Sequence, residues 1–128
     1  LGEYSEGIMS VASSNQDLAP TDFVKRYKEK YGVFATHDAI SHAVAVDVLA
    51  KAIEKAGSKD PKKIRDALSE TDTCEGIASA IPGGCVKFDD TGLNVKTFPL
   101  LVQWRGDTLV TVYPKSVAKA SPVLKQSK

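Results

Sequence analysis

Residues 38–68 read DAISHAVAVDVLAKAIEKAGSKDPKKIRDAL, and this stretch decides how the rest of the chain can fold. The first half of 38–56 is apolar or small at nearly every position, which predicts a long helix buried on most of its sides. The second half is amphipathic and ends before Gly57, a residue type that commonly follows helices. A second helix is expected to begin at Pro61, with Asp60 as its N-cap. The stretch therefore predicts two consecutive helices, the first entering the protein centre.

A shorter helix is expected over residues 20–31, before this pair. Phe23, Tyr27 and Tyr31 are four residues apart, so they form one stripe on the helix. Such a stripe favours a core-facing surface over a cofactor site. The charged residues are expected to face away from it: Lys25, Arg26, Lys28, Glu29 and Lys30.

Most of the remaining apolar stretches predict strands, because they are short and rich in Val, Thr and Phe: residues 6–13, 85–88, 98–104 and 108–113. The last two are expected to form a hairpin through a three-residue loop at 105–107. The order is one strand, three helices and then strands, which indicates an α/β fold with a C-terminal β-hairpin. Because these strands are too few to close a parallel sheet, we expect part of the sheet to lie outside this chain.

Composition excludes some classes of protein. The 128 residues include 17 basic and 16 acidic ones, for a net charge of +1, so no basic field favours nucleic acid as a partner. No apolar run reaches about 18 residues, so no membrane span is expected. The chain begins with Leu1 and shows no signal peptide. We expect it to be a processed or truncated product, and its start does not indicate where the full protein resides.

The two cysteines, Cys74 and Cys85, flank a loop that contains Pro82, Gly83 and Gly84. Such a loop can bend back and bring the sulfur atoms together, so we expect a disulfide. Closing so short a loop contributes about 2–3 kcal/mol in the chain-entropy model. A disulfide favours an oxidising compartment. The alternative, two buried free thiols, stays open.

The sequence contains no arrangement of residues typical of catalysis or metal binding. His37 and His42 are five residues apart, or about 140° around a helix, so they cannot chelate one metal ion together. His42, on an apolar helix, is typical of a hydrogen-bonded structural residue. There is no G-x-S-x-G motif and no phosphate-binding loop. We therefore expect neither an enzyme nor a bound cofactor or metal.

Five pieces of the chain, taken in order, are similar to a known family. They are GIMSVASSN (7–15), FVKRYKEKYG (23–32), AVAVDVLAKAIEKAGSKDPKKIRDAL (43–68), GGCVKFDDTGLN (83–94) and LLVQWRGDTLVTVYP (100–114). Together they resemble the C-terminal part of the leucine/isoleucine/valine-binding family, the type I periplasmic binding proteins. Each piece alone is weakly specific, and the set is much more so. The resemblance covers the chain from about residue 6 to residue 114.

The resemblance implies a fragment of a two-lobed protein with Rossmann-like lobes. A three-stranded hinge joins the lobes, which close on a ligand between them. Residues 1–114 would form the C-terminal portion, crossing the hinge near 10–14, and 115–128 a tail. The three helices would belong mainly to the first lobe, and the hairpin at 100–113 would complete the second.

The function implied is that of the extracytoplasmic solute-binding component of an ABC importer. Its ligand would be a branched-chain amino acid or a related small carboxylate or aromatic compound. Its partner would be an inner-membrane permease, and its location the periplasm. A ligand-sensing receptor domain of the same fold is the main alternative. A small hydrolase or transferase is a weaker one, since no nucleophile–base pair is visible. Self-association would cover exposed sheet edges.

Ligand contacts are implied at two places by the resemblance. Ser13 and Ser14 follow the first strand, and His42 and Ala43 lie near the start of the long helix. Family members often carry a tyrosine where Ala43 stands. The smaller residue leaves room for a bulkier ligand, such as an aromatic acid. A leucine-sized pocket at Ala43 would contradict that hypothesis.

Overall fold

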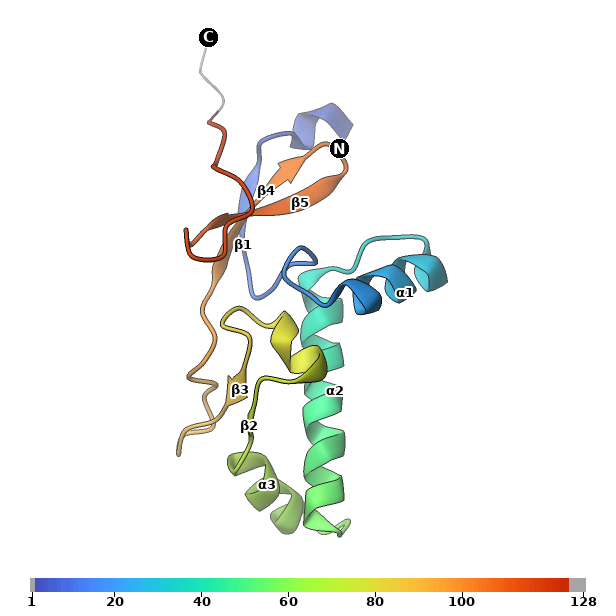
Figure 1. The fold of residues 1–128 in the computed structure, drawn as a ribbon, viewed down its shortest axis with the longest axis vertical. Coiled ribbons are helices and arrows are strands. Elements are labelled where there is room, and N and C mark those ends of the chain that lie inside the picture. Colours follow the sequence, from blue (N-terminus) through green and yellow to red (C-terminus); the bar gives the residue numbers. More distant parts are fainter. Residues whose placement is uncertain (1, 125–128) are drawn as a thin grey trace.

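The chain forms a small antiparallel sheet at one end and a helical region at the other (Figure 1). This computed structural model describes residues 2–124. In chain order, the elements are two 3-10 helices, three α-helices and five strands: η1 (Gly2–Ser5), β1 (Met9–Ala12), α1 (Thr21–Tyr31), α2 (His37–Ala56), α3 (Pro61–Ser69), β2 (Asp72–Thr73), η2 (Gly76–Ala80), β3 (Val86–Lys87), β4 (Leu100–Arg105) and β5 (Thr108–Tyr113). The expected α/β class with three α-helices and a C-terminal hairpin is confirmed.

The sheet has the order β1-β4-β5, with β4 paired antiparallel on both sides. Its core consists of Ala12, Leu100 and Val102, which are buried together. The expected three-residue loop between β4 and β5 is wrong. Arg105 pairs with Thr108, so two residues make the turn. Gly106 has a φ of 63°, which lets the backbone reverse within those two residues.

The helix α2 is the longest element and runs away from the sheet (Figure 1). The Thr36 hydroxyl caps its start by accepting a hydrogen bond from the Ala39 N–H, and Gly57 ends it in the left-handed conformation. The buried residues of α2 are spaced four apart and form a single face: Ile40, Val44, Val48 and Ala52.

The prediction that α2 is buried on most sides is wrong. Val46 is 68% exposed and Leu49 is 43% exposed. The described elements that contact α2, among them α3 and η2, leave these apolar side chains uncovered. Apolar composition shows which surface favours burial, and here this chain alone does not bury it.

The helix α3 begins at Pro61 as predicted, and α1 lies within one residue of its predicted limits. Asp60 caps α3, since its Oδ1 accepts hydrogen bonds from the Lys62 and Lys63 N–H groups, at 2.8 and 3.2 Å. The helix α1 begins at Thr21, one residue later than expected, and Pro20 occupies its N-cap position. Gly32 ends α1 with a φ of 72°.

A disulfide joins Cys74 to Cys85, the pairing expected from the sequence. Just outside it, β2 pairs with β3, and Lys87 Nζ lies 2.6 Å from Asp72 Oδ2. The segment between the cysteines was expected to be a loop, yet it also contains the 3-10 helix η2. Ala78 and Ala80 of η2 are fully buried in the core beside α2, since their small side chains permit close approach.

Part of the expected C-terminal tail packs against the sheet. Gln103 Nε2 donates a hydrogen bond to the Val123 carbonyl at 2.7 Å, and the Val123 N–H donates one to Gln103 Oε1 at 3.0 Å. The Lys119 N–H donates a hydrogen bond to the Thr111 carbonyl. These bonds hold residues up to 123 on the strands β4 and β5.

Removing the disulfide tests its contribution to stability. Replacing both Cys74 and Cys85 with Ser is expected to lower the free energy of unfolding by about 2–3 kcal/mol, because the unfolded chain loses a covalent constraint. Urea denaturation of both proteins, with and without a reductant, measures the effect. The reductant should destabilise the parent chain alone. Equal stability of parent and variant would contradict the expectation.

Adjacent glycines provide a matched test of close packing. A Cβ at Gly83 would lie 1.9 Å from the Lys96 carbonyl oxygen, whereas one at Gly84 would meet nothing within 4 Å. Both have positive φ, so an alanine costs about 1–2 kcal/mol at either site. Gly83→Ala should cost about 3 kcal/mol or more, because the backbone must also move apart. Equal losses in urea denaturation would show that the close approach is unimportant.

Candidate functional site

The end of β1 and the start of α2 meet in a cluster of polar side chains. Ser13 Oγ lies 3.2 Å from Ser41 Oγ, and the two share a hydrogen bond. Ser13 Oγ also lies 3.4 Å from His37 Nδ1. His37 and Ser41 are one helical turn apart, so α2 presents both toward Ser13.

These polar side chains border a groove beside α2. It consists of two adjoining hollows, of about 510 and 420 Å³, which share Ser13, Asn94 and Thr97. The larger hollow continues along apolar residues of α2 that include Val48 and Leu49. We refer to both hollows together as the α2 groove. It combines a polar end with an apolar wall, as small-molecule sites commonly do.

The loop that positions Ser13 is fixed to the sheet by buried hydrogen bonds. Asn15 Nδ2 donates to Thr111 Oγ1 at 3.2 Å and to the Leu109 carbonyl at 3.0 Å. Asp17 accepts from the Thr111 N–H at 2.7 Å and from the Thr111 hydroxyl at 2.6 Å. We call Asn15, Asp17 and Thr111 the polar lock. Asn15 and Thr111 are buried and Asp17 is half-buried, so these bonds are largely shielded from water.

The opposite border of the groove is held by a turn at residues 89–94. Asp89 Oδ1 accepts hydrogen bonds from the Thr91 hydroxyl, the Thr91 N–H and the Leu93 N–H. The Thr91 hydroxyl, followed by the Leu93 N–H, lowers the pKa of the Asp89 carboxyl. Asn94 Oδ1 accepts from the N–H groups of Lys87 and Lys96, which fixes Asn94 at the groove.

The four residues expected to contact a ligand lie in different places. Ser13 lines the α2 groove. Ser14 is 1% exposed, and its hydroxyl donates a hydrogen bond to the His37 carbonyl, so it supports the start of α2. The exposed His42 donates from Nδ1 to the Asp38 carbonyl at 2.7 Å and lies outside the groove. Ala43 lines a separate pocket against α1.

Sequence reasoning missed the groove residues His37, Ser41, Asn94 and Thr97. The spacing of His37 and Ser41, four residues apart at a helix start, was a usable signal for the first two. Asn94 and Thr97 carried no local signal. They reach the groove only because the segment before β4 passes beside α2.

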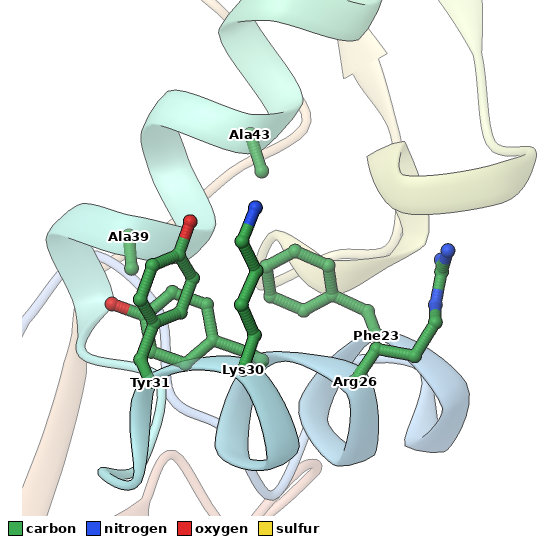
Figure 2. Close-up of a pocket in the computed structure, with 7 residues that line it drawn as sticks. Phe23, Arg26, Lys30, Tyr31, Ala39 and Ala43 are labelled. Atoms are coloured by element: carbon green, nitrogen blue, oxygen red, sulfur yellow. The ribbon is translucent and has the colours of Figure 1, made fainter.

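The pocket beside Ala43 lies between α1 and α2 (Figure 2). We refer to it as the α1–α2 pocket, lined by Phe23, Arg26, Tyr27, Lys30, Tyr31, Ala39 and Ala43. Its volume of about 480 Å³ falls within the usual range for small-molecule pockets. A pocket of this volume is not restricted to a ligand the size of leucine, so it does not contradict the hypothesis of a bulkier ligand at Ala43.

Two expectations for α1 need correction in this pocket. Arg26 and Lys30 were expected to face away from the aromatic stripe, yet both line the same pocket as its rings. The stripe is only partly a core face. Phe23 and Tyr27 pack against the core around α2, whereas Tyr31 is 55% exposed. Charged residues of α1 line the pocket beside the aromatic ones because the pocket opens to solvent along the helix.

The described part of the chain contains no cluster of three His, Cys, Asp or Glu side chains suited to holding a metal ion. Within residues 2–124, no helix has the length and apolar character needed to span a membrane. The groove and the pocket can recognise a small molecule through hydroxyl, imidazole, amide, cationic and aromatic groups.

No protein-family model matches the chain. Among curated proteins, it is 32% identical over 98 residues to Leu/Ile/Val-binding protein homolog 7 of Brucella suis, covering 76% of the chain and 24% of that protein. It is 36% identical over 104 residues to homolog 8 of Brucella melitensis, covering 78% of the chain and 25% of that protein. The chain thus spans about a quarter of the length of these relatives.

A solved structure has a similar fold. The crystal structure of the leucine-binding protein LivK from Thermotoga maritima superposes with a TM-score of 0.65 at 29% sequence identity. The match covers 86% of this chain and 31% of that protein.

Two threonines of β5 test the polar lock. Thr111→Val keeps the side-chain shape but leaves Asp17 and Asn15 without a hydroxyl partner at a buried position. It is expected to lower the free energy of unfolding by about 2–3 kcal/mol. The control, Thr108→Val, removes a part-buried hydrogen bond from Gln16 and should cost about 1 kcal/mol or less. Urea denaturation distinguishes them, and equal effects would contradict a special role for the lock.

Proposed function

The chain belongs to the leucine/isoleucine/valine-binding family of type I periplasmic binding proteins, and on that premise we propose that it is part of the solute-binding component of an ABC importer. The ligand we propose is a branched-chain amino acid or a related small carboxylate, aromatic ones included. The observation that carries the proposal is a similarity of both sequence and fold. The chain is 32–36% identical to Leu/Ile/Val-binding protein homologs, and 86% of it matches the fold of LivK.

The polar end of the α2 groove supports a carboxylate ligand. Ser13 and Ser41 bring hydroxyl groups, and His37 brings an imidazole. The start of α2 adds the positive end of a helix dipole, which favours negative charge. A carboxylate would exchange the hydrogen bond between the two serines for stronger, charge-assisted ones.

The apolar wall of the groove supports a ligand with a hydrocarbon body. Val48 and Leu49 of α2, together with Phe88, line the hollow that continues from Ser41. A branched aliphatic or aromatic side chain placed there would remove apolar surface from water, at about 25 cal/mol per Å². A polar head and an apolar body would thus be recognised at adjoining places.

The proposed mechanism is binding without chemistry. In the whole protein, residues outside this chain would supply the other side of the site, because the chain spans about a quarter of its relatives' length. A ligand that contacts both lobes would shift the protein toward its closed form. The closed form would then dock on an inner-membrane permease. The disulfide between Cys74 and Cys85 agrees with a periplasmic location.

A thermal-shift series tests the proposal on this chain and on a protein of the relatives' length that contains it. Leucine, valine, phenylalanine and benzoate form the panel, and leucinamide is the control without a carboxylate. At saturation, one class of carboxylate should raise the Tm of the longer protein by about 4 °C or more, and leucinamide should not. The short chain should respond weakly, because it supplies only part of the site.

Matched serine variants connect that shift to the groove. Ser13→Ala and Ser41→Ala should each reduce the ligand-induced shift, because each removes a proposed hydrogen bond to the carboxylate. Ser69→Ala, on α3 outside the groove, should leave it unchanged. The proposal fails if no carboxylate shifts the Tm of the longer protein, or if both groove variants respond like the parent.

A further inference from the structure

We propose that the α1–α2 pocket is a separate binding site for a small aromatic carboxylate that lacks an amino group. The pocket shares no lining residue with the α2 groove. The inference therefore goes beyond the proposed function and does not depend on which ligand the groove takes.

One wall of the pocket is aromatic. The ring centroids of Phe23 and Tyr27 are 6.1 Å apart, and those of Tyr27 and Tyr31 are 4.7 Å apart, so the three rings form a continuous surface along α1. Aromatic rings favour offset or edge-to-face contact with another ring at such distances. A planar aromatic ligand fits this wall, and its contact with the rings should contribute more binding free energy than that of an aliphatic ligand of the same size.

The facing wall leaves space for the ligand. Ala39 and Ala43 are one helical turn apart on α2, and both line the pocket opposite the rings (Figure 2). Their small side chains leave a volume of about 480 Å³. A branched side chain at Ala43 would project into this space, so the pocket depends on small residues at this face of α2.

The charge of the lining residues selects an anion. Lys30 extends between the rings of Tyr31 and Phe23 toward α2 (Figure 2). Its Nζ lies 5.3 Å from the Tyr31 ring centroid, and no carboxylate in the described part of the chain forms an ion pair with it. Arg26, by contrast, pairs with Asp22 at 2.9 Å. Lys30 is thus the cation most available to a ligand carboxylate.

The lining also disfavours an amino group. No Asp or Glu lines the pocket, so an ammonium would find no carboxylate partner there and would lie near Arg26 and Lys30. Like charges at short range disfavour such a ligand. An aryl carboxylate should therefore bind more tightly than the corresponding aromatic amino acid, which is the opposite of what a site for amino acids would prefer.

Titration of the 128-residue chain with phenylacetate, followed by NMR chemical shifts, tests the site. Binding is expected with a Kd on the order of 1 mM or tighter, as small ligands in open pockets allow. Phenylalanine and 2-phenylethanol should bind about tenfold more weakly, since one adds a cation and the other lacks the anion. Cyclohexylacetate should also bind more weakly, because it keeps the charge but loses the aromatic contact.

Variants assign the binding to this pocket. Lys30→Gln should weaken phenylacetate binding about three- to tenfold, whereas Lys25→Gln, an equal charge change outside the pocket, should not. Ala43→Leu should abolish binding by filling the pocket. If Ala43→Leu is unfolded by circular dichroism, Tyr31→Ala serves in its place, because Tyr31 is largely exposed and its loss removes one ring of the wall. Ser13→Ala changes the α2 groove and not this pocket, so it should leave the phenylacetate-induced shifts at the pocket residues intact.

The inference is overturned if phenylacetate produces no shifts at residues of α1 and α2, or if binding survives both the Lys30 variant and the pocket-wall variant. It is also overturned if phenylalanine shifts the residues that line this pocket at concentrations as low as phenylacetate does. Loss of phenylacetate binding in Ser13→Ala would show that the ligand binds in the α2 groove. That result would contradict this inference while leaving the proposed function standing.

Discussion

The hydrogen bonds of Asn15 and Asp17 to Thr111 are the interaction on which the rest of the structure depends. Within residues 2–124, the two hydrophobic clusters are separate, one around α2 and one in the sheet. Apolar packing alone therefore leaves their relative placement weakly fixed. The lock joins residues that are far apart in sequence, since Thr111 lies 96 positions after Asn15 and 94 positions after Asp17. Thr111 is buried, and an unpaired polar group at a buried site is costly. It thereby fixes where the chain leaves the sheet for the helices.

The position of the α2 groove follows from that constraint. Ser13 and Ser14 directly precede Asn15, so fixing Asn15 on β5 also sets where both hydroxyls lie. Ser14 reaches the His37 carbonyl, and Ser13 meets the side chains of Ser41 and His37. The polar end of the groove is therefore assembled at the junction of the two clusters. A site at such a junction responds to relative movement of its two sides, as the proposed closure on a ligand requires.

The exposed apolar residues of α2 agree with the relation to longer proteins. Val46 and Leu49 face solvent here, although their side chains favour burial. The chain covers about a quarter of its curated relatives and 31% of LivK, so those proteins have further residues that could cover such a surface.

The α1–α2 pocket differs from this exposed apolar surface, because cationic and aromatic side chains line it. Such a lining is more suited to a small anion than to a packed helix.

The sequence by itself determined the three helices, the Gly57 and Asp60 caps and the two strands of the hairpin, because those features depend on residues a few positions apart. The Thr36 cap, the N-cap position of Pro20 and the two-residue turn of the hairpin were revealed only by the structure. The sequence also pointed to the family and to Ser13, through the order of its short motifs. Only the tertiary structure decided that Ser13 meets His37 and Ser41, that Ala43 faces α1, and that Lys30 lies beside the aromatic stripe. Local periodicity indicates which side chains share a helix face, but packing between distant segments decides what that face meets.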